Sequence, residues 1–140
     1  KAGRDKTAQR LLAEGAAPFV NELAPKLFAA ENRERMPDKV ARTAAIGLGV
    51  SPAGAAATAL GMKARPDRSG VVRSASVPVL LVAGEGDAVV APERTFIDTE
   101  GPNVRRVLLA GCGHMSMMEA PAKLAEAIAG FTEWVISGQA

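Results

Sequence analysis

The spacing of apolar residues changes near residue 76. Before this point apolar side chains recur at intervals of three or four residues, which is typical of helices packed on one side. After it, the continuous run VPVLLVAG at 77–84 and the segment VRRVLLAG at 104–111 are short, rich in Val and Leu, and ended by glycine. Such runs are typical of strands buried in a parallel sheet. The sequence therefore predicts a helical region over residues 1–76 and an α/β region over residues 77–140.

Start and stop signals refine this division. Asp5 is predicted to cap a first helix that Gly15 ends. The pair Ser51–Pro52 predicts another helix start, with a capping hydroxyl followed by proline at the first helical position. Further helices are expected over residues 92–100 and from Pro121 onward. Turn-forming residues predict loops at 65–70, 84–92 and 111–121.

Composition and charge narrow the class of protein. The chain has 140 residues, of which 48% are hydrophobic and 23% charged, so it can form a core and is not a disordered tail. The formal net charge is +2, and basic residues alternate with acidic ones. This even distribution argues against a nucleic-acid interface. No apolar run is long enough to span a bilayer, so we expect no membrane insertion.

The start of the chain and its single cysteine bear on processing and on cellular location. KAGRDKTAQR at the start lacks the apolar region of a secretory signal, and the absence of an initial Met favours an excised or processed segment. Cys112 is the only cysteine, which excludes an internal disulfide and a cysteine-rich zinc site. A reducing compartment, the cytoplasm, is therefore the expected location.

Candidate chemistry lies in the loops that follow the two predicted strands. Asp87 follows the first strand, and His114, the only histidine, follows the second. Neighbouring parallel strands end at the same edge of a sheet, so these side chains are expected to meet. A carboxylate that binds one imidazole nitrogen leaves the other nitrogen free to deprotonate a nucleophile. Glu85 is the rival acid, and Asp87 has the alternative role of a turn or helix-capping residue.

These motifs resemble the C-terminal part of the α/β-hydrolase superfamily. An apolar strand followed by G-x-x-D, and a second strand followed by G-x-G-H, correspond to VPVLLVAGEGD and VRRVLLAGCGH here. The resemblance implies an α/β fold, with a helical cap over residues 1–76 and two parallel strands with flanking helices over residues 77–140. It implies that Asp87 and His114 are the acid and base of a Ser-His-Asp triad. GMKARPDRSG at 61–70 is similar to the cap exit of enol-lactonase-like and haloperoxidase-like esterases.

The sequence departs from that family in one large respect. The nucleophile motif G-x-S-x-G is absent, and Ser51 in GVSPAG is better explained as a helix cap. Two strands also cannot complete a parallel sheet that is covered on both faces. We therefore expect an N-terminal half, as a separate chain or a cleaved fragment, to complete the sheet and supply the nucleophile. Hydrolysis is expected only in that complex.

The resulting hypothesis is a hydrolase of a small carboxylic ester or lactone that needs no metal or cofactor. C–C bond or epoxide hydrolysis on the same fold, a non-catalytic ligand-binding protein and a homo-oligomer remain open alternatives. Cys112 is expected to be a small buried residue, and Asp67 and Asp98 to be turn and helix-surface residues. The candidate substrate-pocket residues, which have core packing as their alternative, are Phe19, Leu27, Phe28, Val89 and Met115.

Overall fold

The computed structural model describes residues 2–97 and 99–138. The chain folds into two compact units. The helical unit contains the residues up to Lys26 and Met36–Pro66, and the strand unit contains Leu27–Arg35 and the residues from Asp67 onward. The predicted cap boundary at residue 76 stays a prediction, although two parts of the proposed cap, Leu27–Arg35 and the residues from Asp67 to 76, lie in the strand unit.

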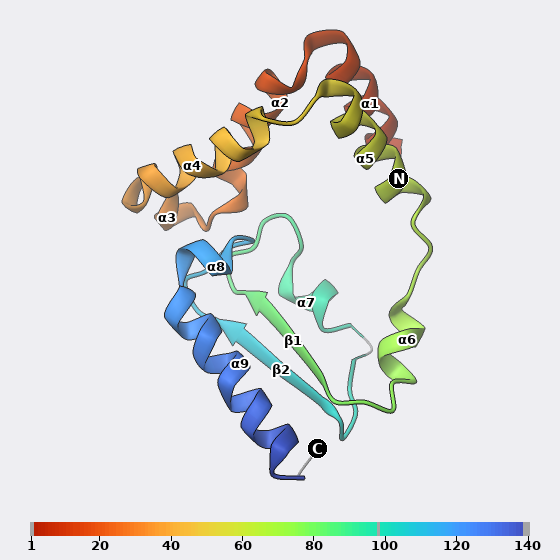
Figure 1. Ribbon diagram of the computed structural model, residues 1–140, viewed down its shortest axis with the longest axis vertical. Helices are drawn as coiled ribbons and strands as arrows, with labels where there is room; N and C mark the ends of the chain where they lie inside the picture. The colour runs from red at the N-terminus through yellow and green to blue at the C-terminus, as the bar shows by residue number, and fades with distance from the viewer. Residues whose placement is uncertain (1, 98, 139–140) are drawn as a thin grey trace. The chain divides into compact units, whose positions relative to one another are not determined.

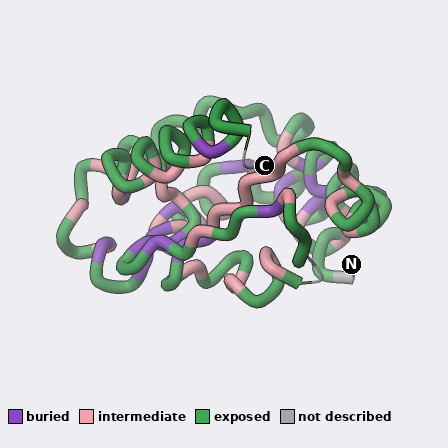
Figure 2. The backbone as a smooth tube through the Cα atoms, turned by 90° about the horizontal axis from the view of Figure 1, so that it is seen from below, coloured by how far each residue is buried: buried purple, intermediate pink, exposed green. Residues whose placement is uncertain are grey.

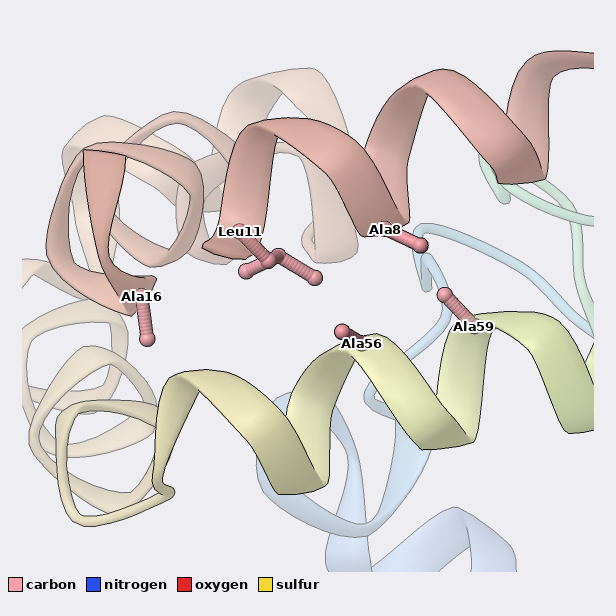
Figure 3. Close-up of a cluster of buried hydrophobic side chains, with 5 residues drawn as sticks. All are labelled: Ala8, Leu11, Ala16, Ala56 and Ala59. Atoms are coloured by element: carbon pink, nitrogen blue, oxygen red, sulfur yellow. The ribbon is translucent and has the colours of Figure 1, made fainter. Parts of the chain in front are cut away.

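The helical unit is held together by small side chains. Its α-helices are α1 (Ala2–Glu14), α2 (Ala16–Leu23), α4 (Pro37–Leu48) and α5 (Pro52–Ala64), and the 3-10 turn η1 (Ala24–Leu27) follows α2. Helices α1 and α5 pack against each other through Ala8 and Leu11 of α1 and Ala56 and Ala59 of α5, and Ala16 of α2 completes the buried cluster (Figure 3). Because three of the four cluster residues on α1 and α5 are alanines, the backbones of these two helices can approach closely.

Two of the three helix signals in this unit are confirmed. Gly15 separates α1 from α2 with φ 82°, and the Ser51 hydroxyl accepts a hydrogen bond from the Gly54 amide at 3.1 Å. The prediction for Asp5 is wrong, because α1 begins at Ala2 and Asp5 lies inside the helix. Its carboxylate instead forms an ion pair with Lys63 of α5 at 2.7 Å.

The strand unit is built on a parallel pair. Its elements are α3 (Ala30–Arg35), α6 (Ser69–Arg73), β1 (Val79–Gly84), α7 (Pro92–Thr95), β2 (Val104–Leu109), α8 (Ser116–Glu119) and α9 (Pro121–Ile136). The register pairs Val79 with Val104 and Gly84 with Leu109, so the predicted parallel pair is confirmed. Helix α9 runs beside β2 and α7 lies next to β1 (Figure 1). Trp134 anchors α9 and stacks under the Arg105 guanidinium, 4.1 Å from the ring centroid.

The expected burial of both strands is wrong for β2 and only partly met by β1, in which Val79–Val82 are half-buried and Ala83 and Gly84 are buried. Val104 and Leu109 are buried, whereas Arg105, Arg106 and Leu108 are exposed. Helix α9 is itself exposed over most of its length (Figure 2). The physical reason is that the described part of the chain supplies only two strands, with α9 as the one long helix packed on β2.

Three short helices also differ from the sequence predictions, and one of them, α8, lies within the loop expected at 111–121. The helix expected over residues 92–100 ends at Thr95, and the Thr99 hydroxyl donates to the Phe96 carbonyl at 2.8 Å in the turn that follows. Asp98 lies outside the described residues. The loop expected at 65–70 contains the start of α6, where the Asp67 carboxylate accepts hydrogen bonds from the Ser69 amide and hydroxyl. The turn role predicted for Asp67 is therefore confirmed.

The length and apolar character of a helix decide whether it can cross a bilayer. Among the described residues, no single helix is long and apolar enough to do so. Helices α4 and α5 meet the length and composition criteria only as a pair, with a 98° bend between them. Ala56 and Ala59 of α5 are buried against α1 within the helical unit.

Candidate active site

The loops after β1 and β2 are fastened to each other at the carboxyl ends of the strands. The Glu85 amide donates to the Leu109 carbonyl at 3.0 Å, and the Gly86 amide donates to the Cys112 carbonyl at 2.7 Å. Gly84 permits this close approach, since a Cβ atom there would lie 2.6 Å from the Cys112 carbonyl oxygen. The strand ends therefore place the two loops side by side.

Asp87 and His114 meet at this edge. Asp87 Oδ2 lies 2.8 Å from His114 Nδ1, which confirms the predicted contact between the two side chains. Asp87 Oδ1 accepts hydrogen bonds from the amides of Val89 and Val90 at 2.8 and 2.9 Å. Because both carboxylate oxygens are engaged, the carboxylate is held in one orientation. An ionised carboxylate can only accept, so Nδ1 is the donor in this contact, and the tautomer that fits it carries its lone pair on Nε2.

The surroundings favour an ionised acid and an accessible base. Only 8% of the Asp87 side chain is exposed. Burial, the largest influence, raises the pKa of Asp87, but the Val90 amide, the His114 ring and the Val89 amide together outweigh it, so the pKa is lowered. The His114 side chain is 39% exposed, and its Nε2 has no hydrogen-bond partner in the part of the chain that the structure describes.

The lowered pKa of Asp87 predicts a pH dependence of stability. The pKa of this carboxyl is about 3.9 in the unfolded chain, and it is lower in the folded protein. Its stabilising contribution is therefore complete above about pH 5 and is lost as the pH falls through the folded value. We expect Asp87→Asn to lower the free energy of unfolding at pH 7 more than at pH 3. Urea unfolding of the complete protein at both pH values measures this. Asp38→Asn, on the exposed surface of α4, is the control, and an equal loss for Asp87→Asn at both pH values contradicts the prediction.

The rival acid Glu85 has a different partner, and Cys112 is buried. Glu85 is exposed and accepts a hydrogen bond from the Gly111 amide at 3.2 Å. Cys112 is buried, as predicted, and burial, followed by the charge of Glu119, raises the pKa of its thiol. A protonated, buried thiol is a poor nucleophile. Among the described residues, no group of three metal-ligating side chains is close enough to hold a metal ion.

The five predicted pocket residues are divided between the units. Phe19 lines a cavity of about 290 Å³ among α1, α2, α4 and α5 of the helical unit. In the strand unit, the Leu27 carbonyl accepts a hydrogen bond from the His114 amide at 2.8 Å, and the Val89 amide donates to Asp87. Phe28 is fully buried, and Met115 is half-buried directly after His114. Contact with substrate stays a prediction for all five.

Sequence reasoning missed Glu119 and Asn32. Both are buried polar residues, and they are joined by a 2.8 Å hydrogen bond from Asn32 Nδ2 to Glu119 Oε2. One signal was present, because Glu119 is an acid among apolar residues in SMMEAP, directly before the final helix. Asn32 lies in the charged segment ENRER, whose composition indicated only a solvated surface.

Comparison with known proteins identifies the fold. No protein-family model matches the sequence, and none of the curated proteins is significantly similar to it. Solved structures do match. An esterase from Thermogutta terrifontis shares 29% identity over 99% of this chain with a TM-score of 0.84. A bromoperoxidase from Bacillus anthracis shares 21% identity over 95% of this chain with a TM-score of 0.80. The chain has the fold of the C-terminal half of the α/β-hydrolases.

The relatives also show how much of the fold this chain carries. The chain spans 50% of the esterase and 49% of the bromoperoxidase. An enol-lactonase from Burkholderia xenovorans LB400 is matched over 49% of its length, with 22% identity, 91% of this chain covered and a TM-score of 0.80. The chain therefore corresponds to about half of each of these α/β-hydrolases.

Proposed function

We propose that the protein completed by this chain hydrolyses small carboxylic esters or lactones, with Asp87 and His114 as the acid and base of its triad. The observation that carries the proposal is the 2.8 Å contact between Asp87 Oδ2 and His114 Nδ1 at the carboxyl ends of two parallel strands. The likeness to an esterase at 29% identity supports a carboxylic ester as substrate. The likeness to an enol-lactonase extends the proposal to lactones.

The proposed chemistry follows from the proton positions. Nε2 of His114 accepts the proton of a serine hydroxyl supplied from outside this chain, and the serine oxygen bonds to the substrate carbonyl carbon. Asp87 stabilises the imidazolium that forms. His114 then protonates the leaving alkoxide oxygen, which departs and leaves an acyl-serine. Water attacks the carbonyl carbon of this ester and gives a proton to Nε2. His114 returns that proton to the serine oxygen as the acyl C–O bond breaks, which releases the carboxylic acid and restores the serine hydroxyl. No cofactor takes part in these steps.

The proposal requires the remainder of the fold. The structure describes one pair of strands, and the matched solved structures are about twice as long as this chain. An N-terminal half, on the same or a separate polypeptide, would extend the sheet and supply the nucleophile. A stable assembly with that half is therefore part of the proposed function.

Activity of the complete protein tests the proposal. We expect turnover of p-nitrophenyl butyrate or a γ-lactone, and stoichiometric labelling by a fluorophosphonate at one serine outside residues 1–140. Peptide mapping locates the adduct, and the buried Cys112 is expected to remain unlabelled. Binding of both substrates without turnover, together with no phosphonate adduct, would show a ligand-binding protein and contradict the proposal.

A further inference from the structure

Glu119 is a buried charged residue that the proposed reaction does not use. It ends the short helix α8, and 6% of its surface is exposed. Four N–H groups converge on its two carboxylate oxygens. Oε1 accepts from the amides of Gly113 and Met115 at 2.9 and 3.2 Å, and Oε2 accepts from the Ala29 amide and the Asn32 side chain, both at 2.8 Å. This set of donors matches a carboxylate, which is an acceptor-only group.

Glu119 binds the backbone amides on both sides of His114. The amides on either side of His114, those of Gly113 and Met115, both donate to Oε1 of Glu119. The amide of His114 itself donates to the Leu27 carbonyl at 2.8 Å. Three consecutive amides are therefore fixed, one by Leu27 and two by Glu119. This arrangement determines where the side chain of His114 leaves the backbone.

The other side of the carboxylate ties the loop to the segment before α3 and to α3 itself. Asn32 donates to Oε2 of Glu119 and also to the Gly111 carbonyl, each at 2.8 Å. Gly113 packs directly on this segment, since a Cβ atom there would lie 2.7 Å from the Phe28 carbonyl carbon. The loop after β2 that carries His114 is thus held between α8 and residues Leu27–Asn32.

We propose that Glu119 is a positioning residue for His114, holding the backbone on both sides of the base so that Nδ1 meets Asp87 and Nε2 faces the reacting atoms. This inference rests on the proposed function. A displacement of catalytic groups by about 1 Å costs roughly 10²-fold in rate. Charge-assisted hydrogen bonds to a buried carboxylate are also stronger than neutral ones. Asn32 supports the same carboxylate from α3.

Glu119→Gln in the complete protein tests the inference. The amide keeps one acceptor oxygen but turns an NH₂ donor toward two of the four N–H groups. We expect kcat for p-nitrophenyl butyrate to fall about 10²-fold, with KM unchanged within a factor of about two. The midpoint of the acid limb of the kcat–pH profile is expected to move, since the contact of His114 with Asp87 is disturbed. Glu133→Gln, on the exposed surface of α9, is the matched control and should change neither quantity.

Titration of active sites with a fluorophosphonate separates positioning from folding. If Glu119→Gln does not accumulate as folded protein, Asn32→Ala decides, because it removes one of the four donors and is expected to lower kcat roughly tenfold. Unchanged kcat per titrated site with an unchanged pH profile overturns the inference, whether or not the yield falls. Wild-type turnover by His114→Ala would refute the proposed function itself, and that result is independent of the Glu119 variants.

Discussion

Replacing His114 by alanine in the complete protein is expected to lower kcat for p-nitrophenyl butyrate by roughly 10⁴- to 10⁶-fold. In the proposed mechanism the imidazole takes the proton of the nucleophile, because its Nδ1 is bound to Asp87 and its Nε2 is free among the described residues. Without it the serine hydroxyl keeps its proton, and the leaving oxygen receives none. KM should change little, since the loss falls on the chemical steps. Steady-state kinetics at saturating substrate measures the effect.

The control for this variant lies three residues away. Met117 is on α8, and 54% of its surface is exposed. Met117→Ala should therefore retain kcat within about twofold, which would show that altering the loop surface is not by itself damaging. A His114→Ala protein with wild-type turnover would mean that another group is the base.

Asp87→Asn is expected to produce the second large loss, about 10⁴-fold in kcat. The asparagine is nearly the same size and can still accept the Val89 and Val90 amides through its oxygen. Its NH₂ group then faces His114 and donates to Nδ1. The imidazole proton is consequently placed on Nε2, the wrong tautomer for accepting a proton from serine. The same kinetic assay at pH 7 measures this loss.

Glu85→Gln is the matched control for the acid. Glu85 lies two residues before Asp87 and binds the Gly111 amide rather than the imidazole. The Glu85→Gln variant should therefore retain kcat within about tenfold. The small loss reflects a weaker hydrogen bond between the two loops. A larger loss for Glu85→Gln than for Asp87→Asn would reverse the assignment of the acid.

Apolar periodicity and the glycines that end apolar runs are enough to predict the two strands that position the site. The continuous apolar run ended by Gly84 predicts β1. Val104–Leu109 predicts β2 from its Val and Leu residues and the glycine that follows, although Arg105 and Arg106 interrupt the run and lie exposed. Adjacent parallel strands then require Asp87 and His114 to share one edge. These features depend on local sequence and on a general rule of sheet geometry.

Features that depend on long-range contacts could not be predicted in the same way. Glu119 is buried because Ala29 and Asn32, about ninety residues earlier, supply donors to it. The hydrogen bonds of Asp5 are likewise decided by Lys63 in another helix. A single sequence shows the polar residues but not the partners that allow them to be buried.

The most direct test of the acid–base assignment combines Asp87→Asn and His114→Ala in one complete protein. If Asp87 acts through His114, as we propose from their 2.8 Å contact, the double variant should be no slower than His114→Ala alone, within about threefold. If the two losses instead multiply, so that the double variant is far slower than His114→Ala, the residues act independently and the account of a coupled pair is wrong.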